Sequence, residues 1–289
     1  MCQFCVQHGE GKKLYLEMNN YSEVLLHEEL SAHQKEIIGA KTRAEAEARS
    51  FADTVIPAIT GVPKPGDETA SVRPRPQLSE DEMVERRQVG YFGQVLPIED
   101  VEQVIDLAAS ITRMPCSCRF ENTGKTDQRY CFGFGMDRWG VLGKFPEAAS
   151  SLETLSREQA KEIFRAYDEE GLIHSIWTHG TPYVWGLCNC DHDCMPYKRY
   201  IEKCGPAAFF RAEYIGQVNW DVCTGCKDCM RQCQFGAQFY SFALGKVYID
   251  PTRCFGCGVC RAACQQDAIT LLPRESHPDA AGIWLKKVR

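Results

Sequence analysis

The chain contains 289 residues, of which 44% are hydrophobic and 25% are charged, and its formal net charge is −6. This composition is typical of a globular protein, and the acidic balance argues against nucleic-acid binding, which needs a basic surface. No apolar run approaches the roughly 18 residues that a membrane span requires, and the first six residues lack the pattern of a signal peptide. We therefore expect a cytoplasmic protein that neither spans a membrane nor binds nucleic acid.

Cysteine is the unusual residue, because the chain contains 17 of them. In a reducing compartment thiols rarely form structural disulfides, so metal ligation is the default interpretation. The odd number also excludes complete internal pairing. The cysteines fall into four groups along the chain: Cys2 and Cys5; Cys116, Cys118 and Cys131; Cys188, Cys190, Cys194 and Cys204; and eight between Cys223 and Cys264.

The N-terminal region, residues 1–60, combines a cysteine pair with predicted helices. The spacing of Cys2, Cys5 and His8 forms half of a metal site, and the alternative is a terminus with two exposed thiols. Apolar residues spaced three and four apart over residues 21–58 predict amphipathic helices. We expect these helices to pack on the middle region or to dock onto another subunit. Residues 61–78 are rich in proline and predict an extended linker.

The middle region, residues 79–205, is predicted to be mostly helical. An apolar stripe over Ile98–Thr112 predicts one helix, which Pro115 would end. Ser156 and Gln159 form a capping box that predicts a second helix, and Gly171 supplies its C-terminal stop. The region carries the two middle groups of cysteines.

One cysteine spacing, Cys-x-x-Cys-x-x-Cys-x-x-x-Cys, occurs twice, starting at Cys223 and again at Cys254, a period of 31 residues. Three thiolates at i, i+3 and i+6 on a curled loop can reach three corners of a cubane iron–sulfur cluster, while the fourth points away. Zinc usually binds paired C-x-x-C units that lie farther apart. The spacing therefore favours iron–sulfur clusters over zinc or a disulfide framework.

These repeated runs resemble the bacterial two-cluster ferredoxins, over about residues 208–272. The resemblance implies a dicluster module, residues 206–272, with pseudo-two-fold symmetry, in which the fourth cysteine of each run binds the other cluster. Two [4Fe–4S] clusters would then be held by Cys223, Cys226, Cys229 and Cys264, and by Cys254, Cys257, Cys260 and Cys233.

This module departs from the ferredoxin pattern in two respects. Gln234 and Gln265 replace the proline that follows each fourth cysteine, and each adds a donor that could reach a cluster sulfur. Six basic and five acidic side chains lie between residues 206 and 272. A nearly neutral module predicts a partner-bound domain with less negative potentials than a free, strongly reducing ferredoxin.

A second metal region is predicted upstream. The pairs Cys116/Cys118 and Cys188/Cys190 resemble the CxCR and CNC elements of a group of ferredoxin-like proteins of anaerobic bacteria. On an extended segment a C-x-C pair points both sulfurs the same way. We expect these four cysteines to bind a third metal centre, with Cys131 and Cys194 as competitors. Three interpretations stay open: a further iron–sulfur cluster, a zinc or mononuclear iron, or thiols without metal.

The sequence as a whole predicts an α+β protein with helical N-terminal and middle regions, a C-terminal dicluster module and a tail over residues 273–289. We expect an electron-transfer protein, the ferredoxin-like subunit of a cytoplasmic oxidoreductase complex, that relays single electrons through two or three [4Fe–4S] clusters. No catalytic constellation of its own is recognised. The alternatives are a stand-alone reductase with a site-differentiated cluster or flavin in the middle domain, and a redox sensor or assembly protein.

Overall fold

The computed structural model describes Tyr15 and residues 93–116, 119, 123–125, 128–134, 152–178, 184–194 and 209–283. The predicted N-terminal helices, the linker, the end of the tail and several cysteines lie outside the described residues. These cysteines are Cys2, Cys5, Cys118 and Cys204. What was predicted for those segments stays a prediction.

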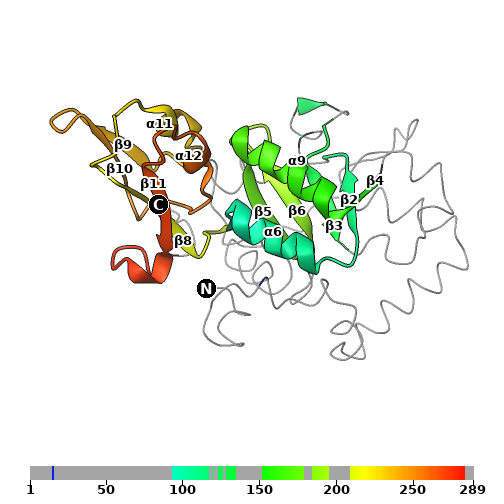
Figure 1. Ribbon diagram of the computed structural model, residues 1–289. Helices are drawn as coiled ribbons and strands as arrows, with labels where there is room; N and C mark the ends of the chain where they lie inside the picture. The colour runs from blue at the N-terminus through cyan, green and yellow to red at the C-terminus, as the bar shows by residue number, and fades with distance from the viewer. Residues whose placement is uncertain are drawn as a thin grey trace, which may run out of the picture.

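A seven-stranded sheet forms the middle of the described structure (Figure 1), in the order β4-β2-β3-β6-β5-β1-β7. Six of its strands pair antiparallel, and β7 joins the edge parallel to β1. The strands are β1 (Gly93–Leu96), β2 (Ile111–Met114), β3 (Cys131–Phe134), β4 (Glu153–Leu155), β5 (Ile173–Thr178), β6 (Val184–Cys190) and β7 (Phe209–Phe210).

Two helices, α6 (Ile98–Leu107) and α9 (Arg157–Glu169), pack against each other and lie across one face of this sheet (Figure 1). Helix α9 begins at the predicted capping box. The Ser156 hydroxyl accepts from the Gln159 backbone N–H at 3.2 Å, and the Gln159 side chain accepts from the Ser156 N–H at 2.9 Å. The predicted helix from the capping box is confirmed, and the helix predicted over Ile98–Thr112 is confirmed for Ile98–Leu107.

The prediction that the middle region is mostly helical is wrong for its described part. Helix α6 ends at Leu107 rather than at Thr112, because residues Ile111–Met114 form strand β2. Ile111 and Thr112 are β-branched, which favours the strand. The other strands of the sheet are two to seven residues long, and in β3 and β6 cysteines and glycines replace the usual alternation of apolar and polar side chains.

The sheet is buried on both faces, and its strands divide their side chains between two cores. Phe132 of β3, Ile176 of β5 and Leu187 of β6 belong to the core beneath the helices. Their immediate neighbours Cys131, Trp177 and Cys188 belong to a different core on the opposite face. Successive residues of a strand point to opposite faces, so the cysteines of this sheet gather on the face away from the helices.

The C-terminal module is built from two interlocked halves. Its elements are β8 (Tyr214–Val218), α11 (Asp228–Gln232), β9 (Gln238–Ser241), β10 (Lys246–Ile249), α12 (Val259–Ala262), β11 (Ile269–Pro273) and the 3-10 turn η4 (Arg274–Ser276). The first strand of one half pairs with the last strand of the other, β8 with β11, while β9 pairs with β10.

Backbone hydrogen bonds repeat across this pairing with the 31-residue period of the sequence. The Asn219 N–H donates to the Ala268 carbonyl at 2.7 Å, and the equivalent Asp250 N–H donates to the Ala237 carbonyl at 2.8 Å. The module therefore has the pseudo-two-fold arrangement that the duplicated motif predicts.

Within the described ranges, no helix is both long enough and apolar enough to cross a bilayer.

We expect Phe164→Ala to destabilise the sheet by about 3–5 kcal/mol, the usual cost of a large aromatic cavity. Phe164 is fully buried on α9, and its ring lies 4.5 Å from that of Phe132 on β3. Chemical denaturation of the cofactor-loaded protein, followed by circular dichroism, measures the loss. Glu162→Ala, an exposed site on the same helix, is the control and should change stability by less than about 0.5 kcal/mol. An equal loss of stability in both variants would contradict the packing of Phe164 in this core.

Candidate iron–sulfur sites

Four cysteines of the module line a first cavity, which we call the outer site: Cys223, Cys226, Cys229 and Cys264. Cys223 and Cys226 come from the loop that leads into α11, Cys229 lies in the first turn of that helix, and Cys264 comes from the other half of the module. Cys226 is exposed, whereas Cys223 and Cys229 are buried.

The other four cysteines line a second cavity, which we call the inner site: Cys233, Cys254, Cys257 and Cys260. Here Cys254, Cys257 and Cys260 are all buried, and Cys233 is contributed by the first half. The structure thus brings together the same two groups of four cysteines that the resemblance implied.

The turns that carry these cysteines require glycine at equivalent places. Gly225 and Gly256 have φ angles of 73° and 74°, a left-handed region that favours glycine. A Cβ atom would lie 2.2 Å from the Gly245 carbonyl oxygen at the first position and 2.0 Å from the Tyr214 carbonyl oxygen at the second. The backbone therefore folds tightly around each cavity.

Backbone amides point at the cysteine sulfurs. The Ala237 N–H donates to Cys233 Sγ and the Ala268 N–H to Cys264 Sγ, each at 3.4 Å. At the inner site the Gly216 N–H also donates to Cys254 Sγ at 3.4 Å. Such bonds favour a sulfur that carries negative charge, and they tune the potential of an iron–sulfur cluster.

Burial opposes negative charge on these thiols when no cation is near. It raises the pKa of Cys229 to about 11, and the neighbouring thiols of its cavity add to the effect. Burial likewise raises the pKa values of Cys254, Cys257 and Cys260. Thiolates buried in this way need a cationic partner, which the iron of a cluster held by these cysteines would supply.

Two buried guanidinium groups lie beside the inner site and fit an anionic cluster there. Arg274 is fully buried, and its Nη2 donates to the Cys254 carbonyl at 2.9 Å. Arg211 is 4% exposed, and its Nε and Nη1 make no hydrogen bond with any described residue. Burial lowers the pKa of each to about 10, while the Cys254 thiol raises it. A buried cation is costly unless negative charge is near, and a four-thiolate cluster supplies that charge.

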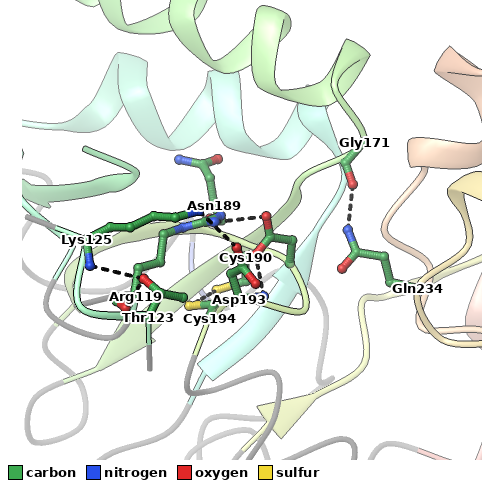
Figure 2. Close-up of polar contacts among 10 residues, drawn as sticks. Arg119, Thr123, Lys125, Gly171, Asn189, Cys190, Asp193, Cys194 and Gln234 are labelled. Atoms are coloured by element: carbon green, nitrogen blue, oxygen red, sulfur yellow. Dashed lines mark hydrogen bonds and ion pairs between the residues drawn. The ribbon is translucent and has the colours of Figure 1, made fainter. Parts of the chain in front are cut away.

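The inner site lies against the middle sheet. The Gln234 side chain donates to the Gly171 carbonyl at 2.8 Å (Figure 2), and Arg261 forms an ion pair with Glu99 of α6 at 2.6 Å. The donor that Gln234 adds to the ferredoxin pattern therefore contacts the turn that follows α9.

Glu213 lies at the same junction. It accepts a hydrogen bond from Gln94 Nε2 of β1 at 3.2 Å. Burial raises the pKa of Glu213 to about 7, against the opposing effects of Gln94 and Arg274. The junction therefore contains a carboxyl group that titrates near neutral pH.

Five further cysteines form what we call the sheet thiol cluster, in the core on the face of the sheet away from the helices: Cys116, Cys131, Cys188, Cys190 and Cys194. Cys131 and Cys188 face each other on β3 and β6, with 3.9 Å between their sulfurs. The sulfurs of Cys190 and Cys194 are 3.4 Å apart (Figure 2).

Cys116 joins the two pairs of the cluster. Hydrogen bonds from Cys131 and Cys194 lower the pKa of the Cys116 thiol. Of the predicted third-site ligands, the structure brings together Cys116, Cys188 and Cys190 with both competitors, while Cys118 lies outside the described residues. None of the thirteen described cysteines forms a disulfide bond.

Arg119 of the CxCR element holds the CNC element in place (Figure 2). Its Nη1 forms an ion pair with Asp191 at 2.9 Å, and its Nη2 donates to the Asn189 carbonyl at 3.3 Å. Burial opposes the charge of Arg119, but Asp191 and the thiols of Cys194 and Cys116 together raise its pKa. Arg119 therefore links the two sequence elements and places a cation beside the sheet thiol cluster.

Asn189, between the two cysteines of the CNC element, points to the helix face. Its Oδ1 lies 2.6 Å from Nδ1 of the buried His174, and its Nδ2 donates to the Tyr130 carbonyl at 3.1 Å. The sequence indicated none of the roles of Asn189, Arg119, Arg211 and Arg274. For one of them, Arg119, its position directly after Cys118 in the CxCR element could have suggested a role beside the cysteines.

Comparison with known proteins agrees with the geometry of the module. Residues 222–269 match the family model described as the 4Fe-4S dicluster domain. The chain is similar to an archaeal-type glutamate synthase (NADPH) of Thermotoga maritima, at 43% identity over 59 residues, 20% of this chain and 12% of the relative. It is also similar to indolepyruvate oxidoreductase subunit IorA of Pyrococcus abyssi, at 43% identity over 54 residues, 19% of this chain and 8% of the relative.

A third relative, the archaeal glutamate synthase (NADPH) of Archaeoglobus fulgidus, is 25% identical over 75 residues, 26% of this chain and 15% of the relative. The chain thus spans less than a sixth of the length of these curated relatives. The C-terminal module is a 4Fe-4S dicluster domain with eight cysteines, consistent with two [4Fe–4S] clusters and with electron transfer.

We expect the stability of the protein to fall as the pH rises from about 4.5 to 7, because of Glu213. The folded protein keeps a proton on this carboxyl group up to a pKa of about 7, whereas the unfolded chain releases it near the ordinary glutamate pKa of 4.5. The state that binds more protons loses stability as the pH rises.

Denaturation midpoints measured across this range should show a shallower slope for Glu213→Gln than for the wild type. Glu162→Gln, exposed on α9, is the control and should keep the wild-type slope. Identical slopes for all three proteins would contradict this role of Glu213.

Proposed function

We propose that this protein is an electron-transfer subunit of an oxidoreductase complex, which passes single electrons through two [4Fe–4S] clusters. The observation that carries the proposal is the pair of four-cysteine cavities within one dicluster domain. Relatives that share this domain are, by name, a glutamate synthase and a subunit of an indolepyruvate oxidoreductase. An iron–sulfur cluster supplies one-electron chemistry to such enzymes.

In this proposal each cluster is bound by the cysteines of one cavity. The outer cluster is bound by Cys223, Cys226, Cys229 and Cys264, and the inner cluster by Cys254, Cys257, Cys260 and Cys233. Each fourth ligand crosses from the opposite half of the module, which keeps the two clusters close enough for electrons to pass between them. The lining of the two cavities supports this division.

The outer site is the proposed point of exchange with a redox partner. Its Cys226 is exposed, and Lys227, which lines the same cavity, lies over the rings of Tyr240 and Phe242. Phe242 is 88% exposed. Other large apolar side chains exposed in the module are Trp220, Val222, Leu244 and Tyr248. An exposed apolar surface with a polar rim is typical of a protein-binding site.

The inner site differs from the outer one in its electrostatics. Arg211 and Arg274 are buried beside Cys254, and a buried positive charge stabilises the reduced, more negative form of a cluster. We therefore infer that the inner cluster has the less negative potential and that electrons entering at the surface move inward.

Replacing one outer cysteine, by Cys226→Ser, should remove the outer cluster and leave the inner one. We expect a loss of about four iron atoms and four acid-labile sulfides per chain, together with loss of the spin–spin interaction between two reduced clusters in the EPR spectrum. Cys257→Ser is the matched variant and should remove the inner cluster instead. Retention of the wild-type iron content in both variants would refute the ligand assignment.

Removing the buried Arg211 guanidinium, by Arg211→Gln, should lower the potential of one cluster by on the order of 60 mV, a tenfold change in a one-electron equilibrium. The other cluster should keep its potential. Potentiometric titration monitored by EPR measures both. Arg231→Gln, which alters an exposed arginine on α11, is the control and should shift neither potential by a comparable amount, because solvent screens its charge. An unchanged Arg211→Gln titration would contradict the inferred asymmetry.

A further inference from the structure

The five thiols of the sheet thiol cluster lie outside both ferredoxin cavities and contact one another. The sulfurs of Cys190 and Cys194 are 3.4 Å apart, and those of Cys131 and Cys188 are 3.9 Å apart. Cys116 is hydrogen-bonded to Cys131 and Cys194. A cubane cluster spreads its ligands over separate irons, so sulfurs in mutual contact favour chemistry between the thiols themselves. The reaction open to two such thiols is the formation and cleavage of a disulfide bond.

Cys190 and Cys194 are the pair that the local structure prepares best for this reaction. Cys190 ends strand β6, and the chain then turns back, because the Cys194 N–H donates to the Asp191 carbonyl at 3.0 Å and the Asp193 N–H donates to Asp191 Oδ1 at 2.8 Å. A disulfide bond is about 2.05 Å long, so the two sulfurs need to approach by about 1.4 Å. His192, in the middle of the turn, is exposed, and the turn can take up this movement without disturbing the sheet.

The second close pair, Cys131 and Cys188, is held more rigidly. These residues lie directly opposite each other on β3 and β6. Both strands are interior to the sheet, since β3 also pairs with β2 and β6 also pairs with β5. Moving these sulfurs together would require the ladder itself to shift. Cys131 therefore offers a matched comparison for the pair at the turn.

A buried cation lies beside the turn. Arg119 is 4% exposed, and its Nη1 forms an ion pair with Asp191 at 2.9 Å (Figure 2). The charges of Cys116 and Cys194 interact with that of Arg119. A guanidinium group near a cysteine favours the thiolate, which is the form that attacks a disulfide and leaves from one. The turn that joins the two cysteines thus also holds the group that makes one of them reactive.

The pair is connected to the inner ferredoxin site through packed side chains. The core that contains Cys190 and Cys194 also contains Phe255, Cys257 and Val259 of the inner-site loop, and all of these residues are buried. Cys257 is one of the proposed ligands of the inner cluster. A redox-active pair at this place therefore lies next to the inner cluster and away from solvent.

We propose that Cys190 and Cys194 form a redox-active pair, a disulfide when oxidised and two thiols when reduced, which collects two electrons from the inner cluster. Reduction breaks the S–S bond and consumes two electrons and two protons. The electrons arrive in two single transfers from the inner cluster, which a one-electron carrier refills through the outer site, and the protons come from solvent. Reoxidation returns the electrons by the same path. The proposal rests on the proposed function in one respect, namely that the clusters supply the electrons.

The number of electrons that the full-length protein accepts tests this proposal. The protein is purified without oxygen, oxidised with thionine, freed of the oxidant and titrated with titanium(III) citrate, a one-electron donor. We expect the wild type to accept about four electrons per chain, one for each cluster and two for the disulfide. Cys194→Ser should accept about two, a loss of half. Cys131→Ser is the matched control and should still accept about four.

Alkylation of the unfolded protein before and after the titration locates the reactive thiols. Mass spectrometry should find Cys190 and Cys194 linked in the oxidised wild type and in Cys131→Ser, and both alkylated after reduction. In Cys257→Ser, which should lack the inner cluster, the disulfide should stay oxidised while the outer cluster is reduced. Iron content and circular dichroism show that Cys194→Ser has folded, and Cys190→Ser serves as the second variant.

Four results would overturn the proposal: a wild type that accepts only two electrons, a disulfide between Cys131 and Cys188 instead of the proposed one, a bound zinc or additional iron that Cys194→Ser loses, or a disulfide that Cys257→Ser reduces as the wild type does. Failure of the proposed function has a different signature, namely a protein without cluster iron. The alkylation pattern still shows in that case whether the two thiols of the turn form a disulfide.

Discussion

Each half of the C-terminal module is completed by the other half, and the cofactor sites depend on this exchange. Strand β8 pairs with β11 across the pseudo-two-fold axis, and paired amides such as those of Asn219 and Asp250 fix the two halves in register. Cys264 is thereby carried into the cavity of the first loop and Cys233 into that of the second. A cavity with three cysteines from its own loop gains its fourth only when the whole module has folded, so cluster binding and folding are coupled.

The middle sheet and its helices contact the inner side of this module. One face carries α6 and α9 and is an ordinary apolar core (Figure 1). The other face carries thiols and the loop of the inner site. The contacts from Gln234 to Gly171 and from Arg261 to Glu99 join the two parts. The inner site is consequently enclosed by the protein, whereas the outer site faces the solvent.

The module was predictable from sequence because its chemistry is local: eight cysteines repeat at fixed spacing, and three of four ligands per site lie within seven residues. The helices were predictable from a capping box and an apolar stripe. The sheet was not, since its strands are short and its order, β4-β2-β3-β6-β5-β1-β7, joins segments far apart in the chain. The sequence named Cys131 and Cys194 only as alternative ligands of the predicted third site. The structure brings both into one cluster with Cys116, Cys188 and Cys190, through the pairing of β3 with β6 and the turn after Cys190. Neither feature can be read from the spacing of the cysteines.

The exposure of Cys226 has a consequence for how the protein meets oxygen. Cys226 is open to solvent and so to dioxygen and peroxide, while Cys254, Cys257 and Cys260 are buried. Oxidation of ligand thiolates follows access and thiolate character. In the proposed arrangement, damage in air would therefore begin at the outer site, and the inner site would be the better protected of the two.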